Sequence, residues 1–126
     1  MTQYANEKKR RLVELLYKKT VGREITWGIN VEKQLYATIA GRSLFVYYGL
    51  NEQGEDLVIF NLFGSDGKQS DVFTDETIAY DNIVSSGFEN WYLLCAALLE
   101  MAKRQASGAD DALDAMIAEL DDDVPF

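Results

Sequence analysis

Histidine is absent from this 126-residue sequence, and cysteine and proline each occur only once. Without histidine the chain has no imidazole base, no histidine-dependent catalytic triad and no histidine ligand for a metal ion. A single cysteine excludes a disulfide within the chain and any metal cluster held by several thiolates. These absences remove common routes to catalysis and metal binding, so the sequence predicts a non-enzymatic protein without cofactor or metal.

Long apolar runs are missing as well. The longest extends from Trp91 to Leu99 and is flanked by Glu89 and Glu100, whereas a membrane-spanning helix needs about 20 apolar residues. The charged segment that follows Met1–Tyr4 does not fit the pattern of a signal peptide. A lone thiol suits a reducing compartment. We therefore expect a cytoplasmic protein that does not bind membranes.

Basic residues are few, and most of them lie at one end of the chain. Residues 1–23 contain seven of the 12 Lys and Arg residues and two acids, while residues 110–126 contain seven acids and no base. The formal net charge of −9 opposes non-specific binding to nucleic acid, because phosphates bind clustered cations. The two ends of the chain are therefore oppositely charged.

Hydrophobic residues, in contrast, make up 48% of the chain, which is enough for a core and excludes general disorder. Helical spacing of apolar residues appears in three segments: 6–20, 88–106 and 110–120. Strand patterns separated by turn sequences appear in five: 24–29, 35–40, 43–49, 57–63 and 69–73. The predicted fold class is α+β, with an N-terminal helix, an antiparallel β-meander of four to five strands, two C-terminal helices and a short acidic tail.

We expect residues 1–120 to form a single α+β domain and residues 121–126 a flexible acidic docking tail, with 74–87 as a connecting segment. The strands around 44–48 and 57–63 are apolar on both faces. Because an antiparallel sheet with one wet face alternates apolar and polar residues, we expect helices to cover one face. Another helix or a second subunit would cover the other, so a homodimer is an expectation.

Three groups of residues resemble reactive sites, and each has a structural explanation. Cys95 lies in the apolar stripe of a predicted helix and is expected to be a small buried hydrophobe. Gly64–Lys68 lacks the spacing of a phosphate-binding loop and is expected to form a hairpin turn. Four carboxylates lack the spacing of a calcium loop and are expected to be solvated: Asp71, Asp75, Glu76 and Asp81.

The first helix carries six basic residues that form a possible secondary contact surface: Lys8, Lys9, Arg10, Arg11, Lys18 and Lys19. Such a surface suits a partner protein, DNA or the acidic tail of the chain itself. Aromatic residues of the meander either belong to the core or offer stacking faces for bases: Trp27, Tyr36, Phe45, Tyr47, Tyr48, Phe60 and Phe63. The second possibility describes a single-stranded nucleic-acid binding protein.

The sequence ends in a run of acids followed by an aliphatic residue, proline and phenylalanine: Asp121, Asp122, Asp123, Val124, Pro125 and Phe126. Pro125 prevents a helix from continuing and favours an extended conformation at Val124. Phe126 combines an aromatic ring with a terminal carboxylate, directly after three acids. Together they predict a ligand for an apolar pocket with a basic rim.

This hexapeptide resembles the C-terminal tip of bacterial single-stranded DNA-binding proteins, an acidic run that closes in aliphatic-Pro-Phe. In that family the tip docks on replication, recombination and repair proteins such as exonucleases and helicases. The resemblance implies that Pro125 and Phe126 occupy the pocket and that Asp121, Asp122 and Asp123 contact basic groups. It covers only residues 121–126. The body has neither the oligonucleotide-binding barrel of that family nor its long linker before the tip.

The sequence thus predicts an interaction protein whose tail docks on, or competes for, tip-binding pockets of bacterial DNA replication and repair proteins. It would act as an adaptor or as an inhibitor. Two alternatives remain open. One is direct binding of single-stranded nucleic acid, and the other is an acidic immunity-type or antitoxin-like inhibitor that blocks a basic active site.

Overall fold

A computed structural model describes residues 2–81, 84 and 86–122 of the chain. Its first helix, α1, spans Thr2–Val21 and therefore begins earlier than the segment 6–20 that the apolar spacing predicts. Val13 and Leu16 are buried on one side of α1. Gly22 and Arg23 end the helix, since Arg23 has a φ of 57° and the Glu24 amide donates to the Lys19 carbonyl.

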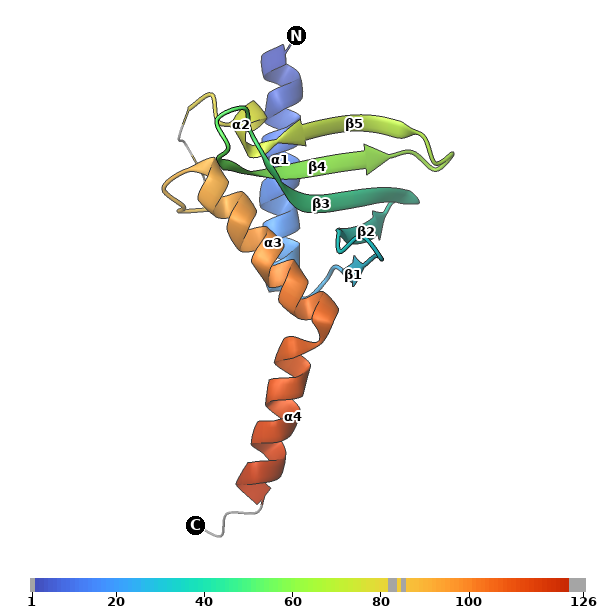
Figure 1. The fold of residues 1–126 in the computed structure, drawn as a ribbon, viewed down its shortest axis with the longest axis vertical. Coiled ribbons are helices and arrows are strands. Elements are labelled where there is room, and N and C mark those ends of the chain that lie inside the picture. Colours follow the sequence, from blue (N-terminus) through green and yellow to red (C-terminus); the bar gives the residue numbers. More distant parts are fainter. Residues whose placement is uncertain (1, 82–83, 85, 123–126) are drawn as a thin grey trace.

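A five-stranded antiparallel meander follows α1 in the order β1-β2-β3-β4-β5, which confirms the predicted α+β class (Figure 1). The strands are β1 (Gly28–Ile29), β2 (Leu35–Ile39), β3 (Arg42–Leu50), β4 (Asp56–Phe63) and β5 (Gln69–Thr74). Gly41, Gly54 and Gly67, one in each of the last three hairpin turns, have φ between 73° and 81°. Since glycine enters this region without strain, these residues fix the turns.

The first strand is shorter than predicted. Residues 24–27 do not pair with β2, because their contacts tie them to the helices instead. The Trp27 indole is buried and donates to the Thr20 hydroxyl at 3.0 Å. Gln105, far along the chain, donates to the Thr20 carbonyl at 2.7 Å. The end of α1 thus holds this segment away from the sheet ladder.

The segment predicted as a connection, 74–87, contains a short helix, α2 (Asp75–Ile78). Thr74 caps it: its side chain accepts from the Thr77 amide, and the Thr77 hydroxyl accepts from the Thr74 amide. This reciprocal pair is a capping box, in which threonine replaces the usual Glu or Gln. The polar residues at 74–77 therefore start a helix, although their composition is typical of a loop.

Two longer helices complete the fold. Asn90 caps α3 (Trp91–Ser107) by accepting from the Leu93 amide at 2.8 Å. Gly108, with a φ of 72°, ends α3, and α4 (Ala109–Asp122) begins immediately after it in a new direction. Both helices agree with the predicted segments to within a few residues.

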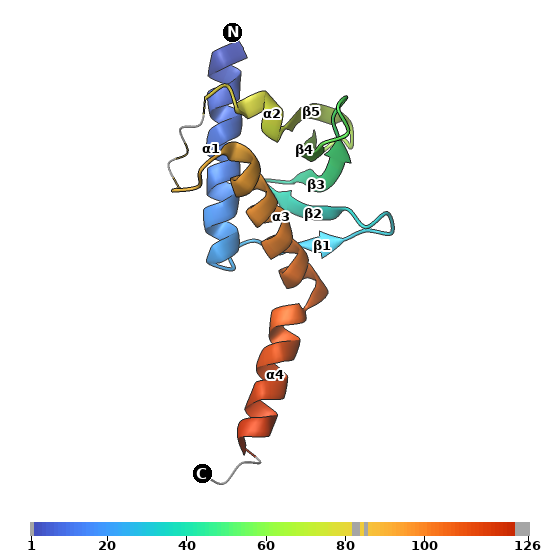
Figure 2. The same ribbon diagram turned by 60° about the vertical axis from the view of Figure 1, so that its left-hand side comes forward.

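Helices α1 and α3 lie on the same side of the sheet, and the core fills the space between them (Figure 2). Phe60 and Val46 of the central strands, Leu94 and Leu98 of α3 and Val13 of α1 are all fully or almost fully buried there. In contrast, α4 extends away from this body along the long axis (Figures 1 and 2). No helix in the described residues has both the length and the apolar character needed to cross a membrane.

Candidate functional site

The C-terminal arm is defined as α4 together with residues 123–126, and α4 is exposed over most of its described length. Its first turn is tied to the body: Arg104 donates from Nε to Asp110 at 3.1 Å, and Arg23 lies 3.8 Å from Asp111. Every residue from Asp111 to Asp121 is exposed. Helix α4 is therefore anchored at its first turn and open to solvent from Asp111 to Asp121.

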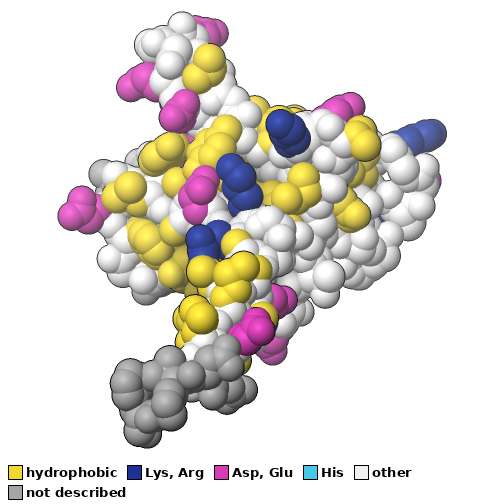
Figure 3. All heavy atoms as spheres, turned by 60° about the horizontal axis from the view of Figure 1, so that its bottom comes forward, with side chains coloured by type: hydrophobic (Ala, Val, Ile, Leu, Met, Phe, Trp, Pro, Cys, Tyr) yellow, Lys and Arg dark blue, Asp and Glu magenta, His cyan; other side chains and the backbone are white. Residues whose placement is uncertain are grey.

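Apolar side chains form a stripe on α4 at helical spacing: Leu113, Met116, Ile117 and Leu120, which are 50% to 64% exposed. The helical period places Asp114 and Asp111 on other sides of α4, and apolar and acidic groups both show on the arm in Figure 3. An exposed amphipathic helix of this kind is suited to lie in a groove of another protein. The sequence predicted this stripe but not its exposure.

The predicted docking tail begins inside α4. Asp121 is the exposed penultimate residue of the helix, and Asp122 is its last residue. Asp123, Val124, Pro125 and Phe126 lie outside the described residues. The helix thus carries the acidic run as far as Asp122.

The six basic residues of α1 do not form one free surface. Lys9 lies 3.7 Å from the Asp71 carboxylate and 5.6 Å from the centre of the Phe73 ring. Arg10 is largely buried and pairs with Asp81 at 3.0 Å. Sequence spacing does not reveal these partners, because the partners are about 60 to 70 residues away.

The remaining basic residues, Lys8, Arg11, Lys18 and Lys19, are exposed on α1. Lys19 pairs with Glu24 at 3.4 Å. Arg11 and Lys18 border a hollow of about 420 Å³. The predicted contact surface is therefore smaller than the composition of α1 implies.

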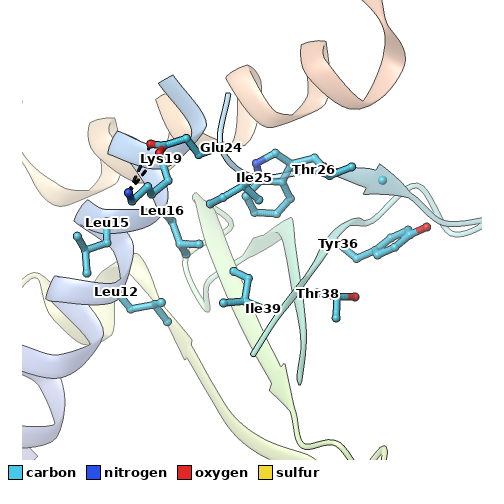
Figure 4. A pocket seen from close by; sticks show the side chains of 12 residues that line it. Leu12, Leu15, Leu16, Lys19, Glu24, Ile25, Thr26, Tyr36, Thr38 and Ile39 are labelled. Atoms are coloured by element: carbon cyan, nitrogen blue, oxygen red, sulfur yellow. Dashed lines mark hydrogen bonds and ion pairs between the residues drawn. The ribbon is translucent and has the colours of Figure 1, made fainter. Parts of the chain in front are cut away.

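An open groove of about 870 Å³ lies between α1, residues 24–27 and β2 (Figure 4). Leu12 and Leu15 of α1 face Ile39 of β2 across it. At its rim Lys19 and Glu24 form an ion pair. The groove thus offers an apolar surface without an unmatched charge that would select a particular ligand.

The four candidate carboxylates have separate structural partners. Asp71 and Asp81 pair with Lys9 and Arg10, as described above, and Glu76 accepts from the Asn51 side chain at 2.8 Å. Asp75 is buried, which contradicts the expectation that all four are solvated. Its carboxylate accepts from the buried Val58 amide at 2.8 Å. Among the described residues no group of acids or cysteine is placed to hold a metal ion.

Burial raises the pKa of Asp75, although the hydrogen bond from Val58 acts in the opposite direction. The folded chain then holds this proton more tightly than the unfolded chain does. Protonated Asp75 therefore stabilises the folded chain, and this contribution is complete below the ordinary pKa of 3.8. It is lost as the pH rises through the higher pKa that Asp75 has in the folded chain. At neutral pH, the charged Asp75 therefore costs folding free energy.

Replacing Asp75 with asparagine is expected to leave stability at pH 7 unchanged or higher, because the amide keeps an acceptor oxygen and carries no charge. The gain in stability between pH 7 and a pH near the ordinary pKa of 3.8 should also be smaller than in the unmodified chain. Alanine at this position should be about 2 kcal/mol less stable than asparagine, because the Val58 amide loses its acceptor. Urea denaturation at both pH values measures this, with Glu52→Gln as an exposed charge control. Equal pH dependence in Asp75→Asn and the unmodified chain would contradict the prediction.

Cys95 is fully buried in the stripe of α3, in agreement with its predicted packing role. Burial raises the pKa of its thiol, and the charge of Asp75 adds to this effect. A nucleophilic cysteine needs a stabilised thiolate, which this environment opposes. Gly64–Lys68 likewise forms the turn between β4 and β5, as predicted.

The aromatic residues of the meander divide between the two faces of the sheet. Trp27 and Phe60 are buried in the core. Tyr48 donates to Glu100 of α3 at 2.9 Å, and burial raises its pKa, as does this hydrogen bond. Strand alternation places a second set on the opposite face: Tyr36, Phe45, Tyr47 and Phe63.

Comparisons with protein-family models, curated proteins and solved structures found no match to this chain. The functional assignment therefore rests on the chain's own residues and on the exposed arm in particular.

Proposed function

We propose that this chain is a non-enzymatic interaction protein of the cytoplasm whose C-terminal arm docks on bacterial DNA replication and repair proteins. The observation that carries this proposal is the exposure of α4 from Asp111 to Asp121, with apolar residues on one side and acids elsewhere. Exposed apolar patches rimmed by polar residues mark interaction sites. The resemblance of residues 121–126 to the tip of single-stranded DNA-binding proteins supports this class of partner.

In this proposal, Phe126 and Pro125 enter an apolar pocket of the partner, and Asp121, Asp122 and Asp123 contact the basic groups around it. The apolar stripe of α4 packs beside the pocket. Short docking peptides lose conformational freedom when they bind, so we expect a dissociation constant in the micromolar range. Occupation of the pocket either recruits this protein to the partner or displaces another tip.

Helix α4 takes the place of the long linker that precedes the tip in single-stranded DNA-binding proteins. It has 14 residues, which corresponds to about 21 Å at 1.5 Å per residue. A helix of this length places its last residue, Asp122, away from the folded body (Figure 1). The body therefore does not block a pocket on the surface of a partner.

Direct binding of nucleic acid receives less support from the contacts of α1. The charges of Lys9 and Arg10 are matched by Asp71 and Asp81, so these two cations are not available to phosphates. The net charge of −9 acts in the same direction. Docking to a protein is the function that the arm and α1 together favour.

Deleting Phe126 is expected to abolish docking. The probe is a fluorescent tip peptide from a bacterial single-stranded DNA-binding protein, bound to a helicase or exonuclease that recognises it. The complete chain should displace this peptide, and deletion of Phe126 should weaken displacement at least about 30-fold, because burial of a phenyl ring contributes about 2 kcal/mol or more. Fluorescence polarisation measures the displacement.

Two further variants sharpen this test. Adding one glycine after Phe126 separates the carboxylate from the ring and should weaken displacement to a similar degree. Glu52→Gln removes one exposed charge from the β3–β4 turn and should leave displacement unchanged. Equal displacement by the complete chain and by the chain without Phe126 would refute docking through the tip.

A further inference from the structure

The sheet has a second face that no helix or strand of the described residues covers. Both α1 and α3 lie on the core side (Figure 2). Alternation along β2–β5 places seven larger apolar side chains on the other side, here called the outer face: Tyr36, Phe45, Tyr47, Leu57, Ile59, Phe63 and Val72. The strand positions on the outer face include no Lys, Arg, Asp or Glu.

The outer face is continuous across three strands. The ring centres of Tyr36 and Phe45, which pair directly between β2 and β3, are 6.1 Å apart. Phe45 meets Phe63 of β4 edge-on, with ring centres 5.5 Å apart. Tyr47 pairs with Ile59 beside this row. The aromatic side chains therefore form one connected apolar surface.

Two glycines make room for side chains of this surface. A Cβ atom at Gly28 would lie 2.6 Å from Cζ of Tyr36, and one at Gly49 would lie 2.5 Å from Cδ1 of Ile59. Tyr36 and Ile59 therefore lie across the glycine backbones. An apolar sheet face is suited to pack against another sheet, as in a sandwich whose layers are about 10 Å apart.

We infer that the outer face is covered by a second copy of this chain, so that the protein is a homodimer with its two sheets face to face. The projected area of the face approaches what such an interface requires. Strands β2–β5 span about 24 Å by 19 Å, or about 450 Å² of flat area per copy. Two copies together bury about 900 Å² of this projected area, without the additional surface of protruding side chains. This is close to the smallest area of a specific interface, about 1,000 Å².

The absence of ionised groups from the outer face also fits a second copy as the occupant. Two chains of net charge −9 repel each other, and an interface without ionised groups brings them together at the least cost. Nucleic acid and charged protein partners need complementary ions, which the outer face lacks. A two-fold interface pairs this neutral face with itself.

The dimer does not depend on docking by the arm, and it leaves the arm accessible. Helix α4 continues from α3, which covers the core side of the sheet, and extends away from the body (Figures 1 and 2). Each dimer would therefore present two arms. Two linked arms bind a partner with two pockets more tightly than one arm does.

The test is the mass of the complete chain between about 1 and 100 μM, measured by analytical ultracentrifugation. We expect the unmodified chain to show twice its 14.2 kDa. Phe45→Glu places a carboxylate near the centre of each face and should make the chain monomeric, with a dissociation constant raised at least about 100-fold. Val72→Glu lies at the margin, where the side chain is 48% exposed, and should raise it about 10-fold. Ile117→Glu introduces the same carboxylate on α4 and should leave the dimer intact.

A monomer at about 100 μM for the unmodified chain would overturn the inference. So would a dimer that Ile117→Glu dissociates and the outer-face variants do not, because association would then run through α4. Near-ultraviolet circular dichroism of the buried Trp27 and Trp91 monitors folding. If Phe45→Glu does not fold, the dissociation constant of Val72→Glu decides.

Discussion

Replacing Arg10 with alanine is expected to lower the free energy of unfolding by about 3 kcal/mol. The side chain is 13% exposed, and its Nε and Nη2 donate to the carbonyls of Ile78 and Asp81 at 2.7 and 3.0 Å. The guanidinium centre lies 3.6 Å from the Tyr80 ring and 4.6 Å from the Trp91 ring. Alanine removes the donors and both stacking contacts, and it leaves the largely enclosed carbonyl of Ile78 without this donor.

Arg11→Ala is the matched control, since Arg11 is the exposed neighbour on the same helix. Its loss should change stability by less than about 0.5 kcal/mol. Arg10→Lys should recover only part of the loss, because one ammonium does not reproduce the planar fork between two carbonyls and two rings. Urea denaturation measures all three. Similar losses for Arg10→Ala and Arg11→Ala would mean that Arg10 does not anchor the segment after α2.

Replacing Phe60 with alanine is expected to cost about 4 kcal/mol of unfolding free energy. Phe60 lies in β4, is 0% exposed and stacks on Phe73 of β5 with ring centres 4.9 Å apart and an interplanar angle of 8°. The large-to-small change removes buried apolar area and leaves a cavity that the surrounding strands fill only in part. Phe60→Leu keeps much of the volume and should cost about half as much.

Phe63→Ala provides the comparison for Phe60→Ala, because Phe63 lies on the same strand with its side chain on the outer face. In dilute solution, where the chain is monomeric, we expect a loss of about 1 kcal/mol, since the ring is only half-buried. At high concentration its effect should grow if the outer face joins two copies, because a dimer links stability to concentration. Equal losses for Phe60→Ala and Phe63→Ala in dilute solution would contradict the assignment of the core to one face.

Local sequence patterns predict most of the elements. Glycine at 41, 54 and 67 marks the three hairpin turns, and the spacing of Trp91, Leu94 and Leu98 predicts α3 and its buried side. These signals are local, because a turn or a helical stripe is set by residues a few positions apart. The pattern fails at 24–27 and at α2, where contacts with Thr20 and a threonine capping pair decide the backbone.

The candidate site shows the same division. The acids and apolar residues of the arm and its resemblance to a docking tip are visible in the sequence. The sequence does not show that α4 leaves the body, with Met116 63% exposed and Leu120 64% exposed. A helix with the same apolar stripe could pack equally well on its own sheet. The exposure leaves this ordinary amphipathic pattern accessible, as the proposed docking requires.

The sequence by itself determined the α+β class, the meander and the exclusion of histidine and multi-cysteine chemistry, because composition and short-range periodicity are sufficient for these. Tertiary structure decided which charges are matched and which apolar faces are covered. Arg10 meets its acceptors 68 and 71 residues along the chain, and only the folded arrangement of α1 and α2 brings them together. The same arrangement places both long helices of the body on one face of the sheet, and among the described residues it leaves the outer face and most of α4 uncovered.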